Sequence, residues 1–87
     1  MIKFFKYIFS KRPYKLLGRG GIEFKRADQL FYVDTNNFLG KNNSVEIFYR
    51  DIRCLDADMD LPDKDKMDIA GELKKALQKD GGNATIL

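Results

Sequence analysis

Histidine and tryptophan are both absent from this 87-residue chain, and cysteine occurs once, as Cys54. Without histidine, the sequence lacks the usual base for a cysteine or serine nucleophile and a common ligand for zinc. A lone cysteine forms no internal disulfide, whereas small secreted domains normally carry several, so the composition favours the cytoplasm. We therefore predict no catalytic residue, metal site or cofactor, and interpret Cys54 as a half-buried structural thiol.

Long apolar runs are also missing. Lys3 and Lys6 interrupt the aromatic N-terminal segment 1–10, whose longest uninterrupted apolar run is 7–9. A secretory signal needs about 7–15 consecutive apolar residues, and a membrane span needs about 20. We predict no membrane span and interpret 2–9 as a first strand, with a basic aromatic segment lying on a membrane surface as the alternative.

The charges are strongly segregated, although the net charge is only +3. Residues 1–26 hold eight of the sixteen basic side chains and a single acid, Glu23, whereas residues 51–72 hold eight of the thirteen acids. Opposed patches of this kind can steer a charged partner.

Strand signals dominate residues 1–52. The alternation and the β-branched and aromatic content predict strands at 2–9, 14–17, 22–25, 30–33 and 45–52. Glycines at 18–21 and a short loop at 27–29 separate three of these strands, and polar turns are expected at 34–37 and 40–43. Local connections of this kind predict an antiparallel meander with one buried face.

The C-terminal third predicts a single helix over 65–80, because Ile69, Leu73, Ala76 and Leu77 recur at spacings of three and four. Asp63 is the expected N-cap, and the glycines at 81–82 are expected to end the helix. Inside it, the low helix propensity of glycine at position 71 is expected to be offset by a close approach of helix to sheet.

The expected fold is therefore one α+β domain over 1–87, in which an antiparallel meander packs on one amphipathic C-terminal helix as a two-layer sandwich. Residues 1–52 form most of the strands, 53–64 form an acidic loop, 65–80 form the helix, and 83–87 form a terminal edge strand.

Two segments resemble ligand-binding motifs but lack residues that those motifs require. A calcium loop opening at Asp56 would need glycine at its sixth position and glutamate at its twelfth, where Leu61 and Met67 stand. The glycines at 18–21 lack the Gly-Lys-Ser/Thr ending and the following helix of a phosphate loop.

Two alternatives to a protein-binding surface remain open. The basic and aromatic N-terminal residues could bind nucleic acid, although alternating aromatics are typical of a core: Lys3, Phe4, Phe5, Lys6, Tyr7, Lys11, Arg12 and Tyr14. A structural alternative is a homo-oligomer joined through an exposed sheet edge at the first or last strand.

From residue 20 onward the chain resembles bacterial polymorphic-toxin immunity proteins, in particular immunity protein family seventy-four. The resemblance lies in Gly-Gly-Ile-Glu-Phe at 20–24, Val-Glu-Ile-Phe-Tyr-Arg-Asp-Ile at 45–52, the acidic segment to Asp65, and the helix at 67–77 closing on Gly81. It implies a cytoplasmic antitoxin, without catalytic residues, that blocks the toxin domain of contact-dependent growth inhibition systems.

Partner toxins of such systems are often nucleases with basic substrate clefts, and an acidic surface can imitate the phosphates that they bind. We therefore expect a cognate toxin domain, and neither nucleic acid nor a small-molecule substrate, to be the partner. The expected interface residues are the acids of the loop and helix start, with two neighbours at the end of the preceding strand: Asp56, Asp58, Asp60, Asp63, Asp65, Tyr49 and Arg50.

Overall fold

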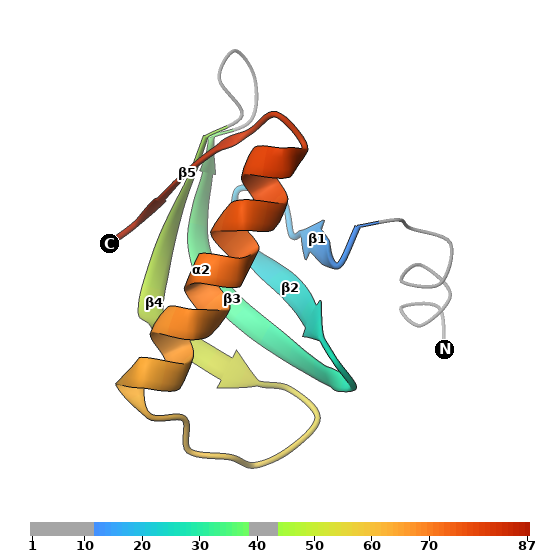
Figure 1. Ribbon diagram of the computed structural model, residues 1–87, viewed down its shortest axis with the longest axis vertical. Helices are drawn as coiled ribbons and strands as arrows, with labels where there is room; N and C mark the ends of the chain where they lie inside the picture. The colour runs from blue at the N-terminus through green and yellow to red at the C-terminus, as the bar shows by residue number, and fades with distance from the viewer. Residues whose placement is uncertain (1–11, 39–43) are drawn as a thin grey trace.

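Alternating apolar residues and tight turns build a five-stranded sheet in the part of the chain that the computed structural model describes, residues 12–38 and 44–87 (Figure 1). The elements are β1 (Tyr14–Leu16), β2 (Gly20–Arg26), β3 (Gln29–Phe38), β4 (Ser44–Cys54), α2 (Asp63–Lys79) and β5 (Asn83–Ile86). The strands predicted around 14–17, 22–25, 30–33 and 45–52 are all present.

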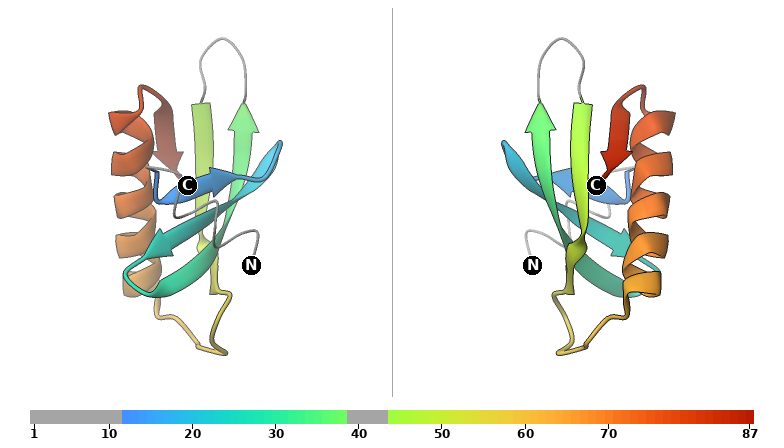
Figure 2. Two further views of the ribbon diagram at one scale, coloured as in Figure 1. Left: turned by 90° about the vertical axis from the view of Figure 1, so that its right-hand side faces the viewer. Right: turned by 90° about the vertical axis from the view of Figure 1, so that its left-hand side faces the viewer.

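The strands lie in the sheet in sequence order, β1-β2-β3-β4-β5. Pairing is antiparallel from β1 to β4, whereas β5 runs parallel to β4. The helix α2 carries the chain back between these two strands, as a parallel pair requires, and it covers one face of the curled sheet (Figure 2). The α+β class with one C-terminal helix is confirmed, and the expectation of a wholly antiparallel sheet is wrong at β5.

The core lies between the helix and the covered face of the sheet. Ile69, Leu73 and Leu77 are buried on α2, as their spacing predicts, and Ala70 joins them. The sheet contributes apolar residues from every strand to the same cluster: Tyr14, Ile22, Phe24, Phe31, Val33, Val45, Ile47, Ile52 and Ala84.

The polar turn predicted at 34–37 is wrong, because β3 continues through these residues to Phe38. Burial alternates along the strand, so Thr35 and Asn37 share the buried face with Phe31 and Val33. Residue types that usually form turns therefore lie in a strand here. The alternation of inward and outward positions predicts this strand better than the residue types do.

A buried hydrogen-bond network explains why polar side chains occupy these inward positions. The amide of Asn37 donates to the carbonyl oxygens of Gly18 (3.0 Å) and Gly21 (3.1 Å), and its Oδ1 accepts from Thr35 Oγ1 (2.7 Å). Thr35 Oγ1 in turn accepts from the N–H of Gly21 at 3.0 Å. The network fastens the β1–β2 turn to β3, and its polar atoms are satisfied as burial requires.

A large irregularity interrupts β4. Tyr32 pairs with Arg53, and Asp34 pairs with Phe48. These two pairs are two residues apart along β3 but five residues apart along β4. Three additional residues of β4 are accommodated between these pairs, and we refer to Tyr49–Ile52 as the β4 bulge. After the bulge the alternation changes phase, because Val45, Ile47 and then Ile52 face the core.

The helix ends differ in part from prediction. Asp63 is the first residue of α2 and Pro62 is the N-cap, without a side-chain capping bond, so the prediction of Asp63 as N-cap is wrong. The glycine stop is confirmed: Gly81 N–H donates to Gln78 O and Gly82 N–H to Leu77 O, each at 3.0 Å, with Gly81 at φ +88°. This is the Schellman arrangement, which favours glycine.

The predicted strand at 2–9 and the predicted turn at 40–43 lie outside the described residues. The alternation at 22–25 is present in β2, but Glu23 is 3% exposed, so the charged positions of this strand do not all face solvent.

Removing the Asn37 side chain should destabilise the fold. Asn37→Ala removes the donor to the Gly18 and Gly21 carbonyls and the acceptor for the Thr35 hydroxyl proton, so we expect a loss of about 2–3 kcal/mol in the free energy of unfolding. Asn36→Ala is the matched control, because Asn36 is exposed on the same strand, and it should change stability by less than about 0.5 kcal/mol. Urea unfolding measures both, and equal effects would contradict the role of the network.

The close approach of helix to sheet expected at Gly71 is not found, since a Cβ placed there meets no atom within 4 Å. Gly71→Ala should therefore raise the free energy of unfolding by about 1 kcal/mol. Gly81→Ala is the control, and it should lower the free energy of unfolding. The space around Gly81 is as open as that around Gly71, but its positive φ is unfavourable for a residue with a Cβ. A lower melting temperature for Gly71→Ala would disprove this explanation.

Candidate protein-binding site

The acidic loop, residues 55–62, connects β4 to α2 at the end of the molecule where the helix begins (Figure 1). Asp58 and Asp60 are exposed there, and neither forms an ion pair or hydrogen bond with another described residue. Asp63 and Asp65 follow in the first helical turn, where the helix dipole favours negative charge. Four of the five predicted interface acids thus lie together at one end of the fold with their carboxylates in solvent.

The fifth predicted acid, Asp56, holds the loop in place. Its Oδ2 accepts from the N–H of Leu30 at 3.1 Å, and its Oδ1 accepts from Cys54 Sγ at 3.1 Å. The bond from Cys54 is the main reason that the pKa of Asp56 is lowered. Asp56 therefore attaches the start of the loop to the first residues of β3.

Cys54 is half-buried beside this carboxylate. Burial and the hydrogen bond to Asp56 raise the pKa of its thiol, which favours the unreactive protonated form at neutral pH. The geometry agrees with a structural thiol.

Large apolar side chains accompany the acids. Leu55 and Met59 in the loop and Met67 in α2 are exposed by 48%, 41% and 42%. Apolar groups gathered at the surface favour association, and methionine is enriched at protein interfaces. The acidic loop therefore combines charge with apolar contact area.

Tyr49 and Arg50, the two predicted non-acidic interface residues, lie in the β4 bulge. Arg50 Nε donates to Tyr49 OH at 3.1 Å, and its guanidinium lies 5.5 Å from the centre of the Tyr49 ring. The hydrogen bond to Tyr49 is the largest cause of a raised pKa at Arg50. The Tyr49 ring is half-buried against the core, so the core holds in place the ring that Arg50 contacts.

A second arginine–tyrosine pair joins β3 to β4. The guanidinium of Arg53 lies 5.0 Å from the centre of the Tyr32 ring, and these two residues are cross-strand partners of β3 and β4. Gly21 makes room for the ring, since a Cβ at that position would lie 2.7 Å from Tyr32 OH. The sequence interpretation missed this pair, although alternation along β3 would have placed Tyr32 on the outer face.

We call the four residues Tyr32, Tyr49, Arg50 and Arg53 the Tyr–Arg platform. Three of them, Tyr32, Arg50 and Arg53, line a shallow depression of about 540 Å³ together with Asp34, Asp51, Ile52 and Lys66, and Tyr49 is hydrogen-bonded to Arg50. Lys66 crosses to the bulge from α2, where its Nζ donates to the backbone oxygen of Arg50 at 2.9 Å. The platform is thus held by side chains from two strands and the helix.

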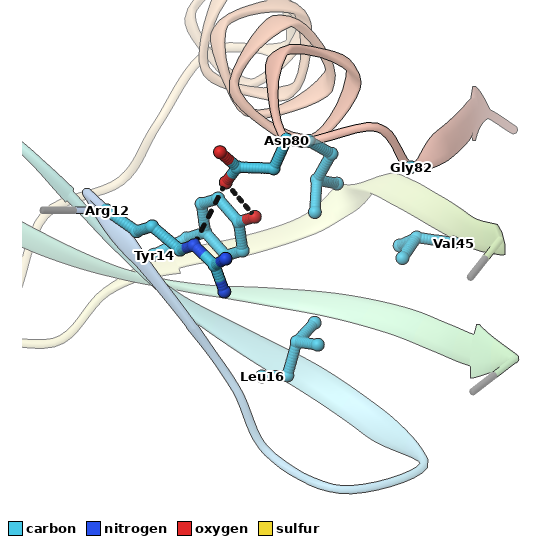
Figure 3. A pocket seen from close by; sticks show the side chains of 7 residues that line it. Arg12, Tyr14, Leu16, Val45, Asp80 and Gly82 are labelled. Carbon is cyan, nitrogen blue, oxygen red and sulfur yellow. Dashed lines mark hydrogen bonds and ion pairs between the residues drawn. The ribbon is translucent and has the colours of Figure 1, made fainter. Parts of the chain in front are cut away.

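A smaller pocket, of about 260 Å³, lies at the opposite end of α2 (Figure 3). There Asp80 Oδ2 accepts a 2.5 Å hydrogen bond from Tyr14 OH and forms an ion pair with Arg12 Nε at 3.3 Å. Leu16, Val45 and Leu77 supply the apolar lining. This clasp joins β1 to the end of the helix.

Several residues of the alternative nucleic-acid surface are engaged in this way. Tyr14 is buried and bonded to Asp80, so its ring is not available for base stacking. Arg12 forms an ion pair with Asp80. The earlier candidates Lys3, Phe4, Phe5, Lys6, Tyr7 and Lys11 lie outside the described residues.

Among residues 12–38 and 44–87, no group of three cysteine, aspartate or glutamate side chains is placed to hold a metal ion. Within the same part of the chain, no helix has both the length and the apolar character to cross a membrane. No protein-family model, curated protein or solved structure matches this chain.

The clasp predicts a loss of stability at high pH. Burial and the bond to Asp80 raise the pKa of Tyr14 to about 12, so the folded state retains a proton that an unfolded tyrosine loses near pH 10. The contribution is therefore complete below about pH 10 and is lost as the pH rises towards 12.

Unfolding of the wild type and Tyr14→Phe at a series of alkaline pH values measures this effect. The phenylalanine variant should be less stable at neutral pH and should lack the part of the alkaline loss that comes from Tyr14. Parallel stability curves for the two proteins between pH 10 and 12 would contradict the assignment.

Proposed function

We propose that this protein is an immunity-type inhibitor that binds a cognate toxin domain through the acidic loop and the Tyr–Arg platform. The observation that carries the proposal is the exposure of Asp58 and Asp60 among Leu55 and Met59, beside two arginines held against tyrosine rings. Asp58 and Asp60 form no ion pair or hydrogen bond with the described residues and so contribute little to the fold, and an external cation-rich partner better explains their position.

The two parts of the surface suit different steps of binding. Solvent-exposed carboxylates act over several ångströms and accelerate encounter with a basic protein. Arginine and tyrosine in a supported geometry lose little side-chain entropy on binding, and both are enriched among residues that dominate interface energies. The acidic loop should therefore govern association, and the platform should govern dissociation.

The class of partner follows from the charge. A nuclease that holds nucleic acid presents a basic cleft, which Asp58, Asp60, Asp63 and Asp65 match in sign. The sequence resemblance to toxin immunity proteins supports the same conclusion. A cognate nuclease toxin is accordingly the partner that we expect in the cytoplasm of the producing cell.

Affinity purification from the source cells, at low and then moderate salt, tests the proposal directly. We expect one protein in stoichiometric amount, lost progressively as salt rises, because screening weakens exposed charge pairs. Co-expression of that protein with and without the present chain should show protection from its toxicity. Recovery of nucleic acid without a protein partner would instead support the alternative of a nucleic-acid-binding module.

The double change Asp58→Asn and Asp60→Asn should slow association with the purified partner about tenfold at low salt, with a smaller change in dissociation. Thermal stability should remain almost unchanged, since neither carboxylate contacts another described residue. Stopped-flow or biosensor kinetics measure both rates.

The matched control is Gln78→Lys with Asn83→Lys, which shifts the net charge by the same amount at exposed positions near the other end of α2. Its association rate should fall far less. If the two double variants associate equally slowly, total charge rather than the acidic loop steers the encounter.

A further inference from the structure

The exposed edges of the sheet differ in how they are protected. Natural proteins shield edge strands with short length, lysine, proline or bulges, because unpaired backbone groups template pairing with another chain. At one edge, β1 has only three residues, with Pro13 before it and Lys15 at its centre. At the other side of the sheet, β4 extends beyond β5, and there the β4 bulge and Lys66 cover the strand.

β5 is also short, with four residues, but the other devices are absent from it. The segment Asn83-Ala84-Thr85-Ile86 contains no charged residue and no proline. It is the terminal strand of the described sheet, and in the right-hand view of Figure 2 it lies between β4 and α2.

The register shows which backbone groups point outward. Leu87 N–H donates to Ile47 O at 2.8 Å, and Ile86 lies opposite Ile47 in the parallel pair. Because backbone groups alternate in direction along a strand, Asn83, Thr85 and Leu87 face β4 with their N–H and C=O groups. The N–H and C=O groups of Ala84 and Ile86 therefore point away from the sheet.

We propose that this edge binds a second copy of the chain through antiparallel β5–β5 pairing, with Thr85 on the twofold axis. In that register Ala84 faces Ile86 of the second copy and exchanges two hydrogen bonds with it, and the symmetric pair exchanges two more. All four outward donors and acceptors are then satisfied in a single self-complementary arrangement.

Side-chain chemistry favours a second copy over a charged partner. The side chains of Ala84 and Ile86 turn towards the core, whereas Thr85 is exposed on the outer face. Its counterpart in the second copy lies directly opposite in a non-hydrogen-bonded pair, an arrangement that favours threonine. The side chains of β5 are uncharged, so the strand itself brings no like charges into contact across the axis.

A four-residue strand pair covers less than the area of about 1,200 Å² that stable interfaces bury, so the dimer should be weak and concentration-dependent. The edge is separate from the acidic loop and the Tyr–Arg platform. The inference is therefore independent of the proposed toxin partner.

Sedimentation equilibrium of the full chain from about 10 µM to about 1 mM tests the inference. The wild type should change from monomer to dimer within this range. Thr85→Lys and Thr85→Glu each place like charges in contact across the axis, and each should weaken dimerisation about tenfold or more. An equimolar mixture of the two variants should recover the dimer as a heterodimer, which damage to the fold would not produce.

Thr85→Val is the matched control and should dimerise like the wild type, because it keeps the β-branched shape without charge. Amide hydrogen exchange gives a second readout: the N–H of Ile86 should become more protected at high concentration. A wild type that stays monomeric at about 1 mM, or charged variants that fail to complement one another, would overturn the inference.

Discussion

The junction at Gly21 sets the geometry on both faces of the sheet. On the buried face, its N–H donates to Thr35 and its carbonyl accepts from Asn37, which fixes the β1–β2 turn against β3. On the outer face, the missing side chain leaves room for the ring of Tyr32, which supports Arg53. The position also has φ +87°, which L-residues with a side chain rarely adopt. One backbone site thus links the packing of the core to the orientation of the candidate site.

Periodicity was sufficient to predict most of the fold. The stripe on α2 and the alternation in β3 and in the first half of β4 follow from the burial of one face, which the order of apolar residues makes visible. Prediction failed where a residue type and a pattern disagreed: Thr35 and Asn37 have turn chemistry, but they lie two and four residues after Val33, in the same strand and on the same face. The parallel direction of β5 was not predictable from local sequence, because it depends on where the helix returns the chain.

The candidate site was predictable to a different extent. The cluster of exposed acids follows directly from the sequence, since a short segment in which every second residue is an aspartate keeps its carboxylates in solvent. The anchoring role of Asp56 required knowledge that Leu30 and Cys54 lie beside it in space. Similarly, Tyr32 and Arg53 are 21 positions apart and meet only through the strand register. Contacts between distant segments are the information that a single sequence does not contain.

The β4 bulge has a consequence for how this surface can change during evolution. Its additional residues lie between the pairs Asp34–Phe48 and Tyr32–Arg53 of the sheet. Pairing with β3 therefore resumes at Arg53 without involving the side chains of Arg50 and Asp51. Both are exposed, and substitutions there remove no buried contact. A population of related chains could therefore diversify recognition at these positions while natural selection on folding acts elsewhere. Under the proposed function, such a segment would allow an inhibitor to diverge with its target while the scaffold stays constant.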